Sequence, residues 1–378
     1  MSHAPKSSLR RSMPHSGQFL SSPRALTIQT DTYGGVCQHA LRALSEALRR
    51  EAEIPRIAEI VECLTEGWAD QRVPGLPPRA SRIGDDHSPF EYSLAFEPAG
   101  VDLRLLLEAQ DTPPSAAGNL QAALELNHRL AQRFGADLTR FDAVADLFLE
   151  ETTAEPFSLW HAIGVGHDNQ VEFKLYLNPQ ARGRAMAFPL MHHTLSRLGF
   201  SDAALACVNR AMPRRGVDEL GYFSLDMSSA PEARVKVYIS HPCVTADELD
   251  TLFEVCPNHQ RGDVIRFCQA MSGRSGPFES KPLMSCLSFV GGEDIPSSVT
   301  LHLPIAHYVE NDQVTCDRFS ALLQDSGLDD EAYQRGLQAI ARRPLSKGPG
   351  LQSYASFRRQ DAALRLTAYF SSELFSRP

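Results

Sequence analysis

Two stretches of the chain alternate apolar and polar residues with the period of two that is typical of a β-strand. In residues 233–240, Val or Ile fills one face, and the other face carries Arg234, Lys236 and Tyr238. Residues 170–178 alternate in the same way, and their polar face carries Glu172, Lys174 and Tyr176. Two cations on one strand face repel each other unless an anion lies between them. The repeated Lys-x-Tyr pattern therefore predicts two strands that face a shared polyanion; the alternative is an ordinary solvated strand face.

The succession helix, helix, strand, strand recurs five times, with a period of about 65 residues. The first unit shows helical periodicity at residues 31–48 and 54–64 and strand-like runs at 90–97 and 101–108. The later helix pairs are expected at residues 119–134 and 139–150, 185–197 and 201–211, 246–255 and 261–272, and 316–325 and 329–342. The strand pairs that follow them are expected at residues 157–165 and 170–178, 219–227 and 233–240, 283–290 and 297–304, and 351–357 and 363–370.

This succession predicts an α+β fold built on a closed barrel of ten antiparallel strands. Strands joined by short hairpins pair antiparallel, and closing the sheet removes its unpaired edges. With the helices covering the apolar faces from outside, the polar faces point into a chamber able to hold a substrate. Residues 29–375 are expected to form this single domain. Residues 1–28 contain no acidic residue and are predicted to be a disordered leader, with a transit peptide as the alternative.

Composition limits the class of partner and the cellular compartment. The chain has 378 residues, 43% of them hydrophobic, and a formal net charge of −9, which argues against a nucleic-acid-binding protein. Its eight cysteines include no C-x-x-C pair and are expected to be buried thiols in a reducing cytoplasm. No apolar run reaches the roughly 18 residues of a membrane span. We therefore expect a cytoplasmic protein with no membrane or nucleic-acid partner.

Alternation also predicts which side chains line the chamber. The inward set is rich in cations and tyrosines, and it comprises Glu91, Ser93, Ala95, Arg104, Glu172, Lys174, Tyr176, Arg234, Lys236, Tyr238, Thr300, His302, Gln352, Tyr354, Ser356, Arg358, Arg365, Thr367 and Tyr369. On the third strand, we expect Leu159, His161 and Ile163 to face inward and Trp160 to face outward.

The inward set indicates a particular chemistry. Fixed Arg and Lys side chains suit a diphosphate, and tyrosine ring faces stabilise a carbocation while they exclude water. A lone inward carboxylate such as Glu91 holds an N–H donor and raises the electron density of an attacking ring. A diphosphate together with a carbocation indicates prenyl transfer.

Four motifs resemble the dimethylallyltryptophan synthase family of indole prenyltransferases, and the chain is similar to the shorter bacterial members. The motifs are G-D-D-H-S-P-F-E-Y-S-L-A-F at 84–96, K-L-Y at 174–176, R-V-K-V-Y at 234–238 and S-Y-A-S-F at 353–357. The resemblance extends from about residue 30 to residue 372 and implies the αββα barrel of that family.

The resemblance also implies roles for individual residues. Glu91 would bind the indole N–H, and His161 would take the proton whose loss restores the aromatic ring. The implied diphosphate ligands are Arg104, Lys174, Arg234 and Lys236, with Arg358 as a further ligand where fungal relatives often have tyrosine. The implied cation shield comprises Tyr176, Tyr238, Tyr354, His302 and Tyr369. The chain departs from the family at Thr300 and His302, where many relatives have Gln or Lys and then Tyr.

The implied reaction transfers a dimethylallyl or longer prenyl group from its diphosphate to tryptophan or a small tryptophan-derived metabolite. The donor ionises to an allyl cation, which the indole ring captures before it loses a proton. The sequence has no D-D-x-x-D motif, and Asp85-Asp86 is interpreted as a loop turn, so no metal or other cofactor is expected. Two alternatives remain open: a non-indole phenolic acceptor, or a non-catalytic barrel that carries a polyphosphorylated or lipidic ligand. Glu91 disfavours the carrier, which has little use for a carboxylate near an anion.

Overall fold

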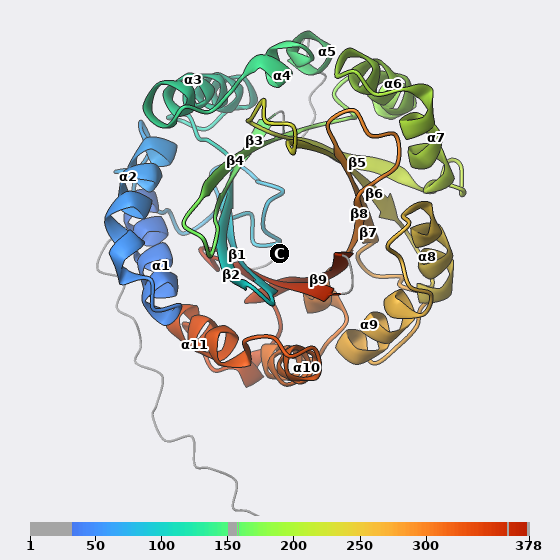
Figure 1. Cartoon of the computed structure of the whole chain (residues 1–378). Helices are drawn as coiled ribbons and strands as arrows, with labels where there is room; N and C mark the ends of the chain where they lie inside the picture. The colour runs from blue at the N-terminus through green and yellow to red at the C-terminus, as the bar shows by residue number, and fades with distance from the viewer. Residues whose placement is uncertain (1–31, 150–156, 158, 361–362, 376–378) are drawn as a thin grey trace, which may run out of the picture.

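The computed structural model describes residues 32–149, 157, 159–360 and 363–375. Within these residues, ten strands pair antiparallel with their neighbours and close into a barrel in the order β1-β10-β9-β8-β7-β6-β5-β4-β3-β2. Figure 1 looks along the barrel and shows the helices as a ring around it. The predicted barrel and its outer ring of helices are confirmed. The leader predicted for residues 1–28 lies outside the described residues.

The strands are β1 (Phe90–Glu97), β2 (Gly100–Leu107), β3 (Leu159–Val165), β4 (Val171–Leu177), β5 (Glu219–Asp226), β6 (Arg234–His241), β7 (Leu283–Val290), β8 (Ser298–Leu303), β9 (Gln352–Gln360) and β10 (Ala363–Ser371). The helices are α1 (Tyr33–Ala47), α2 (Ile54–Thr65), α3 (Ala116–Phe134), α4 (Thr139–Asp142), α5 (Ala145–Leu149), α6 (Ala187–Arg197), α7 (Asp202–Arg210), α8 (Ala246–Leu252), α9 (Asp263–Ser272), α10 (Asp312–Asp325) and α11 (Asp330–Ile340). Each strand starts within two residues of its expected position. In the second unit, the short helices α4 and α5 replace the single helix expected at 139–150.

Local sequence signals set the ends of several helices. Thr245 and Glu248 form a capping box at the start of α8, in which each side chain bonds the backbone N–H of the other residue. Asn311 caps α10 by accepting a hydrogen bond from the N–H of Val314. Gly135 ends α3 in the left-handed conformation, with φ of 70°. These caps hold the helices at fixed lengths outside the strands.

The main hydrophobic core lies between the barrel and the helices. The ring of Phe96 on β1 lies 6.1 Å from the rings of Phe319 on α10 and Tyr333 on α11. Helix α11 also approaches the barrel closely, because a Cβ at Gly336 would lie 2.7 Å from Cδ1 of Leu94. Burying each such side chain contributes about 1.5–3 kcal/mol. The apolar strand faces therefore point outward, as expected, and leave the polar faces inside.

Both layers close where the first unit meets the last. Strand β1 pairs with β10, and Nε of Arg335 on α11 donates to the carbonyl of Ala47 at the end of α1 (2.7 Å). Figure 1 shows the two helices side by side. Closure leaves no free sheet edge among the described strands, so the barrel interior is a fixed frame for side chains.

All eight cysteines lie in described parts of the chain as free thiols, and all except Cys243 are buried. This agrees with the expected absence of a disulfide frame. Among the described residues, no helix combines the length and apolar character needed to cross a membrane.

Candidate active site

Two adjoining cavities lie inside the barrel. The cation cavity has an empty volume of ≈ 770 Å³, and its charged lining comprises Glu91, Arg104, Lys174, Lys236, Arg358 and Arg365. The aromatic cavity has an empty volume of ≈ 610 Å³ and is lined by Arg82, Ile83, Glu91, Leu106, Trp160, Tyr176, Tyr222, Tyr238, Met284, His302, Tyr354 and Tyr369. Six residues line both cavities and are called the junction: Glu91, Leu106, Tyr176, Tyr238, His302 and Tyr369.

Strand register explains why the cations converge. In an antiparallel pair, directly opposed residues share a face, and Lys236 on β6 lies opposite Ser224 on β5 and Ser288 on β7. On the far side, Arg365 on β10 lies opposite Arg358 on β9. Small hydroxyl residues therefore flank Lys236, whereas the two arginines face the same space. Arg104 and Lys174 join them from β2 and β4.

Burial and mutual repulsion shift the pKa values of these cations. Burial, reinforced by neighbouring cations, lowers the pKa of Lys174 to about 8, that of Arg358 to about 9 and that of Arg365 to about 10. Burial also lowers the pKa of Lys236 well below its usual range, with Arg234 and Lys174 adding to the effect. Such a cluster is stabilised by any anion that enters it.

Carboxylates partly neutralise the cations at and beside the cation cavity. Glu172 accepts from Nζ of Lys174 (2.7 Å) and from Nη2 of Arg234 (2.9 Å), and Asp226 pairs with Nε of Arg234 (2.8 Å). Burial favours the neutral form of Glu172, but these two cations hold the pKa of Glu172 well below its usual range. Arg234 shares the inward face of β6 with Lys236, as expected, but it lies at the start of the strand, where it is tied to two carboxylates and does not line the cation cavity.

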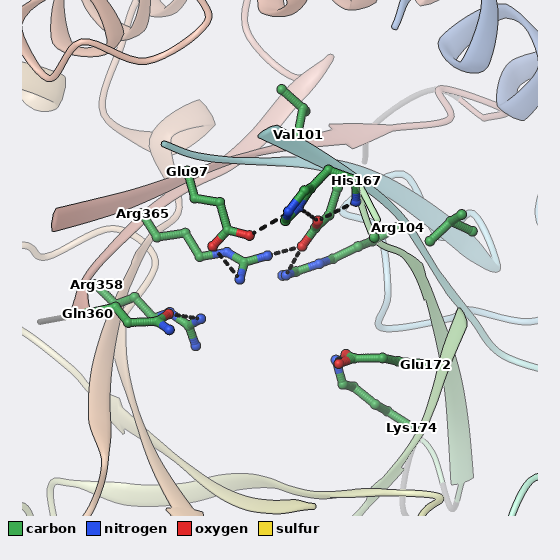
Figure 2. A network of polar contacts seen from close by, with 12 residues as sticks. Glu97, Val101, Arg104, His167, Glu172, Lys174, Arg358, Gln360 and Arg365 are labelled. Atoms are coloured by element: carbon green, nitrogen blue, oxygen red, sulfur yellow. Dashed lines mark hydrogen bonds and ion pairs between the residues drawn. The ribbon is translucent and has the colours of Figure 1, made fainter. Parts of the chain in front are cut away.

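A second ionic network lies around Arg365, and Figure 2 shows it beside the other cations. Arg365 pairs with Glu97 (3.1 Å) and with Asp102, which also pairs with Arg104 (3.2 Å). Glu97, Asp102 and His167 each have one atom that could bind a metal ion, and these atoms lie within 4.8 Å of one another. Because Arg365 contacts both carboxylates, this group is already largely neutralised without a metal ion.

Two cations of the cavity lack such partners. Among the described residues, no carboxylate forms an ion pair with Lys236 or Arg358, although Arg358 donates to Gln360 (2.8 Å). Nε of Arg358 is buried without a hydrogen-bond partner in the described chain. Figure 2 shows the guanidinium of Arg358 facing the space between the strands. A buried cation without a counter-ion is costly, so this part of the cavity is suited to an anion.

The junction is a layer of aromatic rings. Tyr176 and Tyr238 share a hydrogen bond between their hydroxyls (3.3 Å), with ring centroids 5.8 Å apart. The imidazole of His302 lies 5.7 Å from the ring of Tyr238 on one side and 5.7 Å from that of Tyr369 on the other. Burial raises the pKa of all three tyrosines, so they are neutral phenols. This layer provides π faces next to the cation cavity.

Glu91 is held by a β-bulge that the sequence did not reveal. Two residues of β9, Ser353 and Tyr354, oppose Tyr369 on β10 where the register shifts. The bulge directs the hydroxyl of Ser353 at Glu91, to which it donates (2.6 Å). Burial raises the pKa of Glu91 to about 8, although this hydrogen bond opposes the shift. The same bulge turns Gln352 outward, where it bonds Tyr333 and the backbone of Asp312, so its predicted inward position was wrong.

The prediction that His161 lines the chamber was wrong. Trp160 and Ala162 of β3 lie opposite the inward residues Tyr176 and Lys174 of β4, so His161 faces the helices. There it is fully buried, and its Nε2 donates to Oδ1 of Asn127 on α3 (2.7 Å). Burial, reinforced by a nearby arginine, lowers the pKa of His161 to about 3. His161 is therefore a neutral histidine of the outer core.

The aromatic cavity contains two rings that our site prediction missed. Trp160, expected outside, stacks with Phe157 (4.0 Å between centroids) and lies 5.3 Å from Tyr222 of β5. A register shift between Leu220 and Tyr222 brings Tyr222 opposite Tyr238. The alternating residues Tyr222, Ser224 and Asp226 carried a signal for this face, but no inward set was assigned to the fifth strand.

Tyr354 forms the wall of the aromatic cavity near a second ion pair. Nζ of Lys281 lies 4.8 Å from the centre of the Tyr354 ring and contacts Oδ1 of Asp85 (2.5 Å). His307 contacts the other oxygen of Asp85 (2.8 Å). The loop that carries Asp85 is thereby fixed beside the aromatic cavity, which Arg82 and Ile83 of the same loop help to line.

Comparison with known proteins agrees with this geometry. The family model "Tryptophan dimethylallyltransferase" matches residues 67–335. The chain is similar to 6-dimethylallyltryptophan synthase from Micromonospora olivasterospora in complex with DMASPP and Trp, with 28% identity, 92% of this chain and 99% of that chain covered, and a TM-score of 0.86. It is also similar to 5-dimethylallyl tryptophan synthase from Streptomyces coelicolor in complex with DMASPP and Trp (29%, 93% and 98% covered, TM-score 0.84).

A further similar structure is the prenyltransferase PriB with L-tryptophan and dimethylallyl thiolodiphosphate (30% identity, 91% and 98% covered, TM-score 0.83). The family match spans well over half of the chain, and these structures share its barrel nearly end to end. The chain therefore belongs to the tryptophan dimethylallyltransferase family of prenyltransferases.

Proposed function

We propose that the protein transfers a dimethylallyl group, or a longer prenyl group, from its diphosphate to the indole ring of tryptophan or a small tryptophan-derived metabolite. The observation that carries this proposal is the meeting of a cation cavity and an aromatic cavity at one layer of aromatic rings. The similar structures that contain DMASPP and Trp support the same pair of ligands.

The cation cavity would bind the diphosphate and stabilise it as a leaving group. Lys236 and Arg358 would contact it first, because no carboxylate among the described residues competes for them. The diphosphate would also displace the carboxylates that pair with Lys174, Arg104 and Arg365, and these three cations would then donate charge-assisted hydrogen bonds to it. Fixed positive charge at the leaving oxygens lowers the barrier to ionisation.

The junction would hold the allyl cation. Tyr176, Tyr238, His302 and Tyr369 surround the point where the cavities meet, and Tyr354 extends the layer toward the acceptor. Neutral ring faces attract a cation and leave no water to capture it. Glu91 would accept the indole N–H, which orients the ring and raises its electron density.

We further propose that turnover needs no metal ion. The cations already supply the charge that a metal would bring to the diphosphate, and Arg365 pairs with the carboxylates of the Glu97, Asp102 and His167 group. We also propose that residues 29–375 form one catalytic domain and that the enzyme is cytoplasmic, in keeping with eight free thiols.

The test is incubation of the purified protein with dimethylallyl diphosphate and L-tryptophan in EDTA, with the product identified by mass spectrometry. At a donor concentration near the wild-type KM, we expect prenylated tryptophan from the wild type, loss of product with Glu91→Gln and little product with Lys174→Ala. The yield should be unchanged with Lys347→Ala, an exposed lysine outside both cavities. Complete loss of activity on chelation would contradict the metal-independent reaction.

Assays with other acceptors and donors distinguish the two alternative functions, a prenyltransferase with a phenolic acceptor and a non-catalytic carrier. Faster turnover of hydroxynaphthalenes or tyrosine than of tryptophan would indicate a phenolic acceptor. Tight diphosphate binding without any product, from geranyl diphosphate and cyclic tryptophan dipeptides as well, would indicate a carrier.

A further inference from the structure

The position of His161 leaves the proposed reaction without the base that the sequence had indicated. Capture of the allyl cation by a ring carbon gives an arenium ion, and the ring becomes aromatic again only when that carbon loses its hydrogen as a proton. His161 lies outside the barrel wall, with its Nε2 bonded to Asn127. A different group must therefore accept the proton.

The junction contains two side chains with a basic lone pair. Of its six residues, Leu106 has none, and the three tyrosines are neutral phenols that are poor proton acceptors. The remaining two are Glu91 and His302. Glu91 is assigned to the indole N–H, and its carboxylate already accepts from Ser353. His302 is therefore the group at the junction whose lone pair is not already assigned.

His302 is built into the wall where donor and acceptor would meet. It lies on β8 opposite Met284 of β7 and Ser356 of β9, and its ring lies between those of Tyr238 and Tyr369. Within the described residues, its ring nitrogens make no hydrogen bond. An imidazole held by ring contacts alone, with both nitrogens free, can present a lone pair to a bound ligand.

We infer that His302 is the general base that removes the ring proton from the arenium ion. This inference rests on the proposed function. In this step the aromatic C–H bond breaks, its electron pair returns to the ring, and the proton binds the free ring nitrogen of His302 to give an imidazolium ion. The diphosphate released beside it carries the compensating negative charge, and the proton leaves with diphosphate or passes to solvent.

The surrounding charges suit this role. Burial, with Lys236 and Arg104 adding to it, lowers the pKa of His302 to about 3, so the imidazole is neutral before reaction. Both of these cations line the cation cavity. Diphosphate bound there would offset their positive charge, so His302 would become a stronger base once the leaving group is in place.

The test compares the wild type with His302→Phe and His302→Tyr, which keep a ring in the shield but lack the basic nitrogen. His193→Phe, at an exposed position on α6, is the matched control and should retain wild-type activity. We expect kcat to fall on the order of 10²-fold in both His302 variants. Circular dichroism and thermal melting identify any variant that fails to fold, and the other variant then decides the test.

Two isotope measurements separate a base from a shield. With ring-deuterated L-tryptophan, the kinetic isotope effect on kcat should rise above that of the wild type, because proton loss becomes slow. With donor labelled by ¹⁸O at the bridging oxygen, more label should move to non-bridging positions in the recovered donor per turnover. An arenium ion that has not lost its proton releases the allyl cation again, and this cation recombines with diphosphate.

Each other outcome overturns the inference. A lower rate with both isotope readouts unchanged would leave His302 as a shield alone, and an unchanged rate would assign the proton to another group. Prenylation at the indole nitrogen would remove the ring proton transfer altogether. In all three cases the proposed function stands, whereas failure of the wild type to form any prenylated product overturns both.

Discussion

Replacement of Ser353 by alanine tests how the site controls the charge of Glu91. The buried Glu91 accepts one hydrogen bond from Ser353 (2.6 Å), and its pKa is raised to about 8. The ionised carboxylate accepts the indole N–H in a stronger, charge-assisted hydrogen bond than the neutral acid does. With a pKa near 8, about one tenth of the free enzyme is ionised at pH 7, so kcat/KM should rise with pH and level off above pH 8.

The expected size of the effect follows from the lost hydrogen bond. A hydrogen bond to a charged group is worth about 1.5–3 kcal/mol, and one pKa unit corresponds to about 1.36 kcal/mol. Because the Ser353 hydroxyl favours the ionised form of Glu91, Ser353→Ala should move the midpoint of the kcat/KM pH profile upward by about one to two pH units. At pH 7, kcat/KM should fall about 10- to 100-fold.

The assay is kcat/KM for tryptophan between pH 6 and pH 11, because this ratio reports ionisations of the free enzyme. Ser93→Ala is the matched control, since Ser93 lines the same cavity on the strand of Glu91 and should leave the midpoint unchanged. If Ser353→Ala lowers activity equally at every pH, or leaves the midpoint unmoved, the reasoning about Glu91 is wrong.

Four further substitutions test other parts of the site. Glu91→Gln should raise the free energy of unfolding by on the order of a few kcal/mol at pH 9 and hardly at all at pH 4. Burial raises the pKa of Glu91 to about 8, so the wild-type protein loses stability as the pH rises through that value, whereas the uncharged glutamine avoids this loss. Equal urea denaturation midpoints for wild type and variant at pH 9 would contradict this. Lys174→Ala should raise the donor KM about 10- to 100-fold, and an unchanged KM would remove Lys174 from the diphosphate site. Glu172→Gln should bind inorganic diphosphate several-fold more tightly by calorimetry, because Glu172 occupies Lys174 in the free protein; weaker binding would refute this competition. His161→Ala should lower the free energy of unfolding by about 2–4 kcal/mol while the folded variant still forms product, and loss of product without loss of stability would return His161 to the chemistry.

The barrel was predictable because its units repeat and its strands alternate regularly. On β4 and β6, apolar residues fill one face without interruption, so the inward positions of Lys174, Tyr176, Lys236 and Tyr238 follow from period two alone. Strands linked by hairpins pair antiparallel, and closing the sheet into a barrel removes the unpaired edges that an open sheet would leave.

The third strand could not be placed in the same way. Its two faces, Trp160 with Ala162 and Leu159 with His161 and Ile163, are both largely apolar. The polar residue His161 faces the helices because Asn127, more than thirty positions earlier in the chain, satisfies it there. A single strand carries no information about such a partner, so its phase was open to error.

The contacts of Glu91 and the pairing of the cations also lay beyond the sequence. The bulge that directs Ser353 toward Glu91 inserts one residue into β9, which inverts the face of Gln352 without any local signal. The carboxylates that neutralise Arg234 and Arg365 belong to other strands. Arg234 and Arg365 therefore have carboxylate partners, whereas Lys236 and Arg358 have none among the described residues. Which cations are paired depends on strand register, which the sequence does not give.

A crystal structure with dimethylallyl thiolodiphosphate and L-tryptophan tests the central claim most directly. We expect the diphosphate oxygens within hydrogen-bond distance of Lys236 and Arg358, and the indole N–H on Glu91 with the ring in the aromatic cavity. The allyl group should lie between the two, against the ring of His302. Diphosphate bound outside the cation cavity, or an indole ring whose N–H does not reach Glu91, would contradict the account.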